Sequence, residues 1–208
     1  MSVDWKIFHA ALQHSRDGHN LKALADLSTL MPDAETDSDR AAIALGEASC
    51  YSLLQDFSKS RESLKSATIY AQEDRVAMSQ VALTEGSLYA LEKEYDLACE
   101  KFASVKSQYR DLLVQPEHED FALELDSRFS CALVDAGRFS EAIAIFRELF
   151  KRDELKDRQR LEVFFSVALM RTGHSPEALS LLFAAAKGKN AELSQIALEY
   201  LSEVEKTE

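Results

Sequence analysis

The sequence predicts an all-α fold, a solenoid of about five antiparallel helix pairs followed by a C-terminal capping helix. Three observations support this prediction. Only six Gly and three Pro occur among 208 residues, whereas a β-rich protein needs many turns built from such residues. Apolar residues recur at alternating steps of three and four, with no sustained period of two. The helical segments also repeat along the chain at a nearly regular spacing.

The individual helices follow from this periodicity and from the breaks between them. The segment 95–112 places small or apolar side chains every three or four residues, which marks one buried helix face. Gly18, Gly137 and Gly173 supply helix-stop signals, and Ser175-Pro176 is a helix start. We therefore expect eleven helices, at 4–16, 20–31, 38–55, 58–72, 75–92, 95–113, 119–136, 140–152, 156–172, 176–187 and 190–205.

Short links between successive helices predict antiparallel pairs, and these pairs repeat. The hinges within the pairs align at Gly18, Gln55, Lys93, Gly137 and Gly173. Their separations are 37, 38, 44 and 36 residues. A single helix pair cannot bury both of its faces, so neighbouring pairs must stack against one another.

The same pattern of small and large residues follows each hinge. A small residue lets the second helix cross the first closely, and a large residue four positions later fills the groove beside it. Another apolar or small residue comes three positions after that. The five sets are Ala23, Leu27 and Leu30; Ser60, Leu64 and Ala67; Ala98, Phe102 and Val105; Ala142, Phe146 and Leu149; and Ala178, Leu182 and Ala185.

With these residues in place, the chain from about residue 4 to 187 resembles the tetratricopeptide repeat family. The best match comprises Gly86, Tyr89, Tyr95, Ala98 and Phe102. The resemblance implies a right-handed solenoid whose first helices line a concave surface. It also implies a protein-binding role. The chain departs from the family in its spacing, which exceeds the usual repeat of about 34 residues, and in lacking the first-helix Trp in its central repeats.

The repeat pattern predicts one domain that spans residues 1–208. Its repeats are expected at 4–31, 38–72, 75–113, 119–152 and 156–187, and the capping helix at 190–205. The outward side chains of that last helix are mostly acidic, as at Glu192, Glu199, Glu203 and Glu205, which suits a cap over the last exposed apolar edge.

Charge and cysteine content limit the classes of partner. The formal net charge of −12 argues against a general nucleic-acid binder and against docking on an anionic membrane. The three cysteines at 50, 99 and 131 form no CxxC pair, which favours reduced, buried thiols in a cytoplasmic protein. The N-terminus shows no basic leader followed by an apolar run.

The sequence offers no constellation that predicts catalysis. It contains no GxxxxGK loop, no GxGxxG motif and no GxSxG elbow. We therefore expect no enzyme activity, no cofactor and no metal site. Cys131 with Arg128 one turn earlier is a weak candidate for a reactive thiol, because a reactive thiol needs a nearby cation or base.

The resemblance makes the inward side of the first helices the candidate binding site. The positions at which chaperone-binding members of the family carry Lys and Asn are Leu45 and Ser49, then Leu83 and Ser87, so that carboxylate clamp is absent. We predict a mostly apolar groove lined by Leu45, Ser49, Gln80, Leu83, Ser87, Ala90, Ser127, Arg128, Cys131, Arg160, Val163 and Phe164.

These features favour an adaptor, scaffold or chaperone that binds a peptide or helical segment of another protein in its concave groove. Two alternatives stay open. The chain could be a structural or oligomerising subunit that uses its convex face or ends. It could also be a sensor of a small ligand or peptide, for which the neighbourhood of Arg128, Cys131 and Arg160 is the only support.

Overall fold

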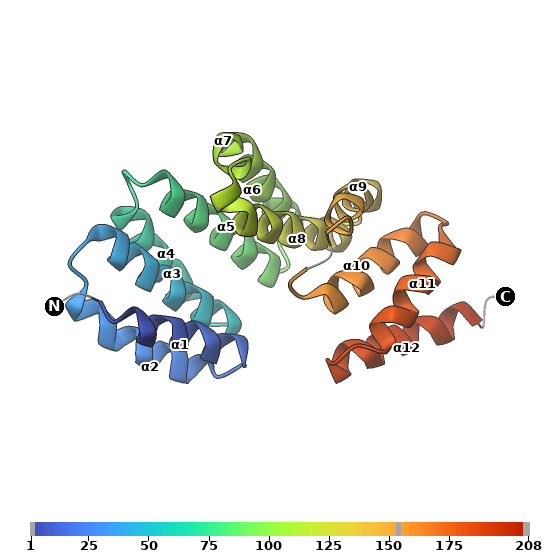
Figure 1. Ribbon diagram of the computed structural model, residues 1–208, viewed down its shortest axis with the longest axis horizontal. Helices are drawn as coiled ribbons and strands as arrows, with labels where there is room; N and C mark the ends of the chain where they lie inside the picture. Colours follow the sequence, from blue (N-terminus) through green and yellow to red (C-terminus); the bar gives the residue numbers. More distant parts are fainter. Residues whose placement is uncertain (1–2, 153–154, 206–208) are drawn as a thin grey trace. The chain divides into compact units, whose positions relative to one another are not determined.

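A computed structural model describes residues 3–152 and 155–205. Within these ranges the chain forms twelve α-helices, two short 3-10 helices and no strand, so the fold is all-α (Figure 1). The backbone contacts divide the chain into two compact units, Met1–Gln115 and Pro116–Glu208. No helix within the described ranges is long and apolar enough to cross a membrane.

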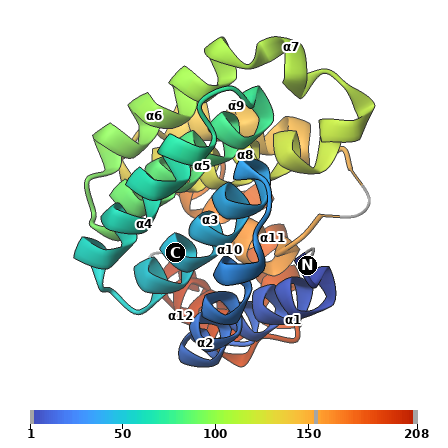
Figure 2. The ribbon, with the colours of Figure 1, turned by 90° about the vertical axis from the view of Figure 1, so that its left-hand side faces the viewer.

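The first unit consists of three antiparallel helix pairs and a short extra helix. Its pairs are α1 with α2, α3 with α4, and α5 with α6, and each first helix also packs beside the first helix of the next pair. Helix α3 packs on α4 of its own pair and on α2 of the preceding pair, and Figures 1 and 2 both show α3 beside α4. The bounds are α1 Trp5–Arg16, α2 Asn20–Leu30, a 3-10 turn Met31–Asp33, α3 Asp37–Leu53, α4 Phe57–Tyr70, α5 Arg75–Leu91, α6 Tyr95–Gln108 and α7 Arg110–Leu113.

The second unit repeats this packing with two pairs and a final helix. Helix α8 packs on α9, α10 packs on α11, and α10 contacts α8, α9 and α12 as well. Helix α12 covers α11, and Ala197 and Leu201 bury their side chains against this last pair. The bounds are a 3-10 turn Pro116–His118, α8 Glu119–Asp135, α9 Phe139–Leu149, α10 Arg158–Arg171, α11 Ser175–Ala186 and α12 Ala191–Glu205.

One expected helix is broken. The sequence predicts a continuous helix over 95–113, but α6 ends at Gln108 because Tyr109 leaves the helical region, with φ −114° and ψ 24°. At this break the Arg75 guanidinium donates to the Gln108 carbonyl at 3.4 Å and to Asp111 at 2.7 Å. The link at 153–154 between the fourth and fifth expected repeats lies outside the described residues.

All five expected hinges share one backbone geometry. Gly18, Gln55, Lys93, Gly137 and Gly173 all have φ between 61° and 82°, in the left-handed region. The residue after each hinge donates its N–H to the carbonyl five positions earlier, as Glu94 does to Tyr89 at 2.9 Å. This is the Schellman arrangement, which satisfies the last carbonyls of the first helix and turns the chain into the second.

The expected small and large residues form the core of each pair. Ala23, Ser60, Ala98, Ala142 and Ala178 are all fully buried, and the large residue four positions later is buried in every repeat. In the third pair the ring of Phe102 lies so close to Gly86 that a Cβ there would approach it to 2.6 Å. The first-helix glycine is therefore required by the close crossing of α5 and α6.

Candidate functional site

One stripe on each of α3 and α5, on the side predicted to line the groove, carries no charged residue. On α3 the positions 42, 46, 49 and 53 lie at steps that keep one helix face, and on α5 the positions 80, 84, 87 and 91 lie 38 residues later. Helices α3 and α5 pack side by side, so the two stripes form one surface. Gly46 is buried against Leu27, so the accessible part, called the neutral face here, consists of Ala42, Ser49, Leu53, Gln80, Thr84, Ser87 and Leu91.

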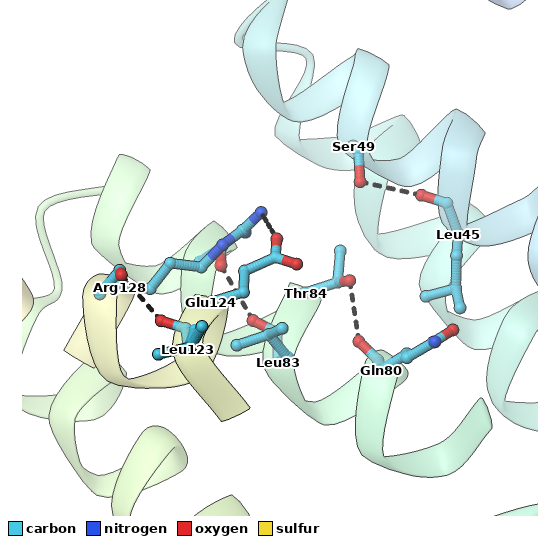
Figure 3. A network of polar contacts seen from close by, with 10 residues as sticks. Leu45, Ser49, Gln80, Leu83, Thr84, Leu123, Glu124 and Arg128 are labelled. Atoms are coloured by element: carbon cyan, nitrogen blue, oxygen red, sulfur yellow. Dashed lines mark hydrogen bonds and ion pairs between the residues drawn. The ribbon is translucent and has the colours of Figure 1, made fainter. Parts of the chain in front are cut away.

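The hydroxyl groups of the neutral face donate to carbonyls of their own helices. Ser49 donates to the Leu45 carbonyl at 3.0 Å, and Thr84 donates to the Gln80 carbonyl at 2.8 Å (Figure 3). Ser87 bonds to the Leu83 carbonyl in the same way, at 2.9 Å. A partner that covers these groups therefore leaves none of these donors unsatisfied, which keeps the cost of desolvation low.

Two leucines occupy the hinge end of the neutral face. Leu53 is 51% exposed and Leu91 is 46% exposed, at equivalent positions in the last turns of α3 and α5. Gln80 is exposed at the other end. The arrangement suits contact with an uncharged, partly apolar segment of a partner, since large apolar side chains contribute most of the free energy of such contacts.

The equivalent stripes in the second unit are charged. On α8 the stripe consists of Glu124, Arg128, Cys131 and Asp135, and on α10 of Arg160, Phe164, Val167 and Arg171. Arg128 donates to Glu124 of its own helix at 2.5 Å (Figure 3). The Arg160 guanidinium lies over the Phe164 ring, 5.5 Å from its centroid.

Cys131 does not have the environment of a nucleophile. Its side chain is 5% exposed, and burial raises the pKa of the thiol to about 12, although Arg160 acts in the opposite direction. A thiol with so high a pKa carries almost no thiolate at neutral pH. Burial also raises the pKa of the Asp135 carboxyl, and Arg160 again lowers it.

The predicted groove residues divide into buried and accessible side chains. Leu45, Leu83, Cys131 and Val163 are at most 9% exposed, so they support the surface from below. The exposed residues are Gln80, Arg128 and Arg160, and the half-buried ones are Ser49, Ser87, Ala90, Ser127 and Phe164. The structure places Leu45, Ser49, Gln80, Leu83, Ser87 and Ala90 together in the first unit, and Ser127, Arg128, Cys131, Arg160, Val163 and Phe164 in the second.

The sequence prediction omitted several accessible members of these stripes. Leu53 and Leu91 are the largest omissions in the first unit, and Asp135 and Arg171 in the second. Each lies eleven residues after the first member of its stripe, at the end nearest the hinge. Counting back two positions from the aligned hinges would have found all four, because Leu53, Leu91, Asp135 and Arg171 each precede their hinge residue by two.

The three cysteines are free thiols and all are buried, as expected from their composition and spacing. Among residues 3–152 and 155–205, no cluster of three or more His, Cys, Asp or Glu side chains could hold a metal ion.

Comparisons with known proteins identify the fold. No protein-family model and no curated protein matches the chain. Several solved structures match the chain. Pseudomonas aeruginosa PilF matches with a TM-score of 0.65 and 13% identity, over 96% of this chain and 83% of that one. A kinesin light chain-like repeat protein of Podospora anserina matches with a TM-score of 0.61 and 15% identity, over 86% of this chain and 92% of that one.

A third similar structure is YrrB, described as a TPR protein with an unusual peptide-binding site. It matches with a TM-score of 0.54 and 16% identity, over 94% of this chain and 90% of that one. The chain therefore has the fold of a tetratricopeptide-like α-solenoid with divergent repeats, which confirms the fold class and the resemblance predicted from the sequence. At sequence identities this low, structural similarity establishes the fold, and function has to be argued from the residues of the site.

Proposed function

We propose that the protein is a non-enzymatic interaction module that binds a peptide or helical segment of another protein on its first-helix faces. The observation that carries this proposal is the neutral face of α3 and α5. It is an accessible, uncharged surface with two half-exposed leucines, on a chain whose formal net charge is −12. Helix α4 of the same unit, in contrast, exposes the charged side chains of Lys59, Arg61, Glu62 and Lys65.

Two further observations support the proposal. The candidate nucleophile, Cys131, is buried, and burial raises the pKa of its thiol. In addition, one structure of the same fold, YrrB, is described as having a peptide-binding site. Extended peptides and amphipathic helices bind to apolar grooves through a few buried side chains.

The test is affinity capture from native lysate with a variant of the neutral face. Ser49→Arg with Gln80→Arg adds two cations at half-buried or exposed positions, so the helices should remain folded. The matched control is Ser58→Arg with Gln72→Arg, which adds the same charge at exposed positions of α4 and the turn after it. Helicity and melting temperature should agree among the three proteins.

We expect at least one protein to be captured by the wild type and by the control, and to be lost with the neutral-face variant. Burying two unpaired guanidinium groups at a contact opposes binding strongly, which makes loss the expected result. Equal recovery by all three proteins would contradict a binding site on this face.

A further inference from the structure

The stripe on α10 differs from every other first-helix stripe in the chain. It carries a cation at each end, Arg160 and Arg171, with Phe164 and Val167 between them. These four residues lie at steps of four, three and four, which place them along one side of the helix. Both guanidinium groups are exposed, and Phe164 and Val167 are half-buried.

The two arginines are not neutralised by their own helix. The carboxylate of α10 is Glu162, which is buried and accepts from Arg158 at 3.2 Å. Within residues 3–152 and 155–205 neither Arg160 nor Arg171 forms a salt bridge. On α8, the helix packed alongside, burial raises the pKa of the Asp135 carboxyl and the charge of Arg160 lowers it.

The Arg160 guanidinium is also held in place. It lies over the Phe164 ring, 5.5 Å from the ring centroid, in a cation–π contact. A guanidinium that is already oriented loses less side-chain entropy when it binds. The chain is acidic overall, so two cations on one stripe stand out against the surrounding field.

We propose that the α10 stripe binds an acidic protein segment, with one carboxylate on Arg160, one on Arg171 and an apolar side chain on Phe164 and Val167. This rests on the proposed function, that first-helix faces bind protein segments, and names the chemistry that the second unit recognises. Arg160 and Arg171 are separated by eleven residues, or about 16 Å along the helix axis. An extended peptide covers that distance in about five residues.

The experiment measures binding of a fluorescein-labelled synthetic peptide with two glutamates about five residues apart and a leucine between them. A second peptide has glutamine in place of both glutamates. The chain is tested as wild type, as Arg160→Gln/Arg171→Gln, and as Lys187→Gln/Lys189→Gln. The last variant removes the same charge from exposed positions of the link between α11 and α12.

We expect saturable binding of the glutamate peptide to the wild type that weakens as salt is added. The arginine variant should bind it roughly tenfold or more weakly, and the lysine variant should bind as the wild type does. The glutamine peptide should bind the wild type weakly. Because both arginines are exposed, an unchanged melting temperature shows that the loss is one of recognition.

Three results would overturn the proposal. They are no saturable binding to the wild type, equal loss in the lysine variant, and equal affinity for the glutamine peptide. The lysate capture with the neutral-face variant then separates the two claims. If that capture depends on the neutral face while the acidic peptide fails, the proposed function stands and the inference about α10 falls.

Discussion

Two of the five hinges place a long side chain where the backbone favours glycine. Gln55 has φ 61° and Lys93 has φ 66°, whereas the other three hinges are glycines. The left-handed conformation costs a non-glycine residue about 1–2 kcal/mol. The Schellman hydrogen bonds and the packing of the two helices impose the hinge geometry, so Gln55 and Lys93 adopt the left-handed conformation despite its steric strain.

We expect Lys93→Gly to stabilise the protein by about 0.5–1 kcal/mol, because the relief of strain exceeds the entropy that glycine gains on unfolding. The matched control is Lys65→Gly in the exposed interior of α4, which should destabilise by about 1 kcal/mol. Gly137→Ala should also destabilise, by about 1 kcal/mol, although no atom lies within 4 Å of the added Cβ. Urea denaturation measures all three, and a destabilising Lys93→Gly would contradict the hinge account.

A second residue-scale prediction concerns Glu47 on α3. Burial raises the pKa of its carboxyl, which means that the folded protein disfavours the ionised form. Glu47→Gln should therefore stabilise the protein at neutral pH, by less than about 1 kcal/mol because water still screens the group.

The pH dependence of this effect has a definite sign. A carboxyl with a raised pKa lowers stability once it ionises, so the advantage of the glutamine variant is full at neutral pH. It should disappear as the pH falls through the pKa of the group, where both proteins are uncharged at this position. Glu62→Gln on the exposed side of α4 is the control. An advantage of Glu47→Gln that persists in acid would contradict desolvation as its cause.

At the scale of single elements, one amide adds to the apolar packing that holds α12 to its unit. The Gln159 amide of α10 donates to the Ala185 and Asn190 carbonyls and to the Ser194 hydroxyl, and it accepts from the Asn190 N–H at 2.9 Å. These groups end α11 and begin α12, so Gln159 satisfies the link between the two helices. Gly188 packs directly on this amide.

We expect Gln159→Ala to destabilise the protein by about 1 kcal/mol, since it leaves the Asn190 N–H without its acceptor, while the Ala185 and Asn190 carbonyls keep Ser194 as a donor. The loss should be local. Hydrogen–deuterium exchange should show reduced protection in α12 and at the end of α11, with little change in α1 to α4. The control is Gln195→Ala on the exposed side of α12. Uniform loss of protection over the second unit would count against a local role.

The same scale shows what the sequence could and could not predict. Helix positions and hinges follow from local signals, and all five hinges were found, including the two without glycine. The break at Tyr109 was not predicted, because small and apolar residues continue at helical spacing through it to Leu112. Leu45 and Leu83 were predicted to line the groove, but both side chains are buried. The spacing of apolar residues along one helix does not show which of them neighbouring helices will cover.

At the scale of the whole molecule, the helix at each end differs from the helices inside the array. Ile43, Gly46 and Cys50 of α3 are buried, and Ile43 and Cys50 pack with Leu27 and Leu30 of the preceding helix. The positions 37 residues earlier, on α1, are Lys6, His9 and Gln13, which are all exposed. Helix α12 exposes Glu192, Glu199 and Glu203. Polar outer faces of this kind keep repeat arrays from associating through their ends.

We expect Lys6→Ile with Gln13→Leu to increase self-association, because it gives α1 the apolar face that inner helices bury. Light scattering over a range of concentrations should show a higher mean mass than for the wild type. The control, Lys65→Ile with Ser58→Leu on α4, adds apolar side chains away from the end of the array. If the α1 variant behaves as the wild type does, its polar residues have no capping role.

The central claim is that the first-helix face of α3 and α5 contacts a protein partner, and photo-crosslinking tests it most directly. A photoreactive amino acid replaces Gln80 on the neutral face in one protein and Lys65 on the exposed side of α4 in another. After irradiation in native lysate, we predict a crosslinked partner from position 80 and none of the same mass from position 65. A partner joined only from position 65, or equally from both, would contradict the claim.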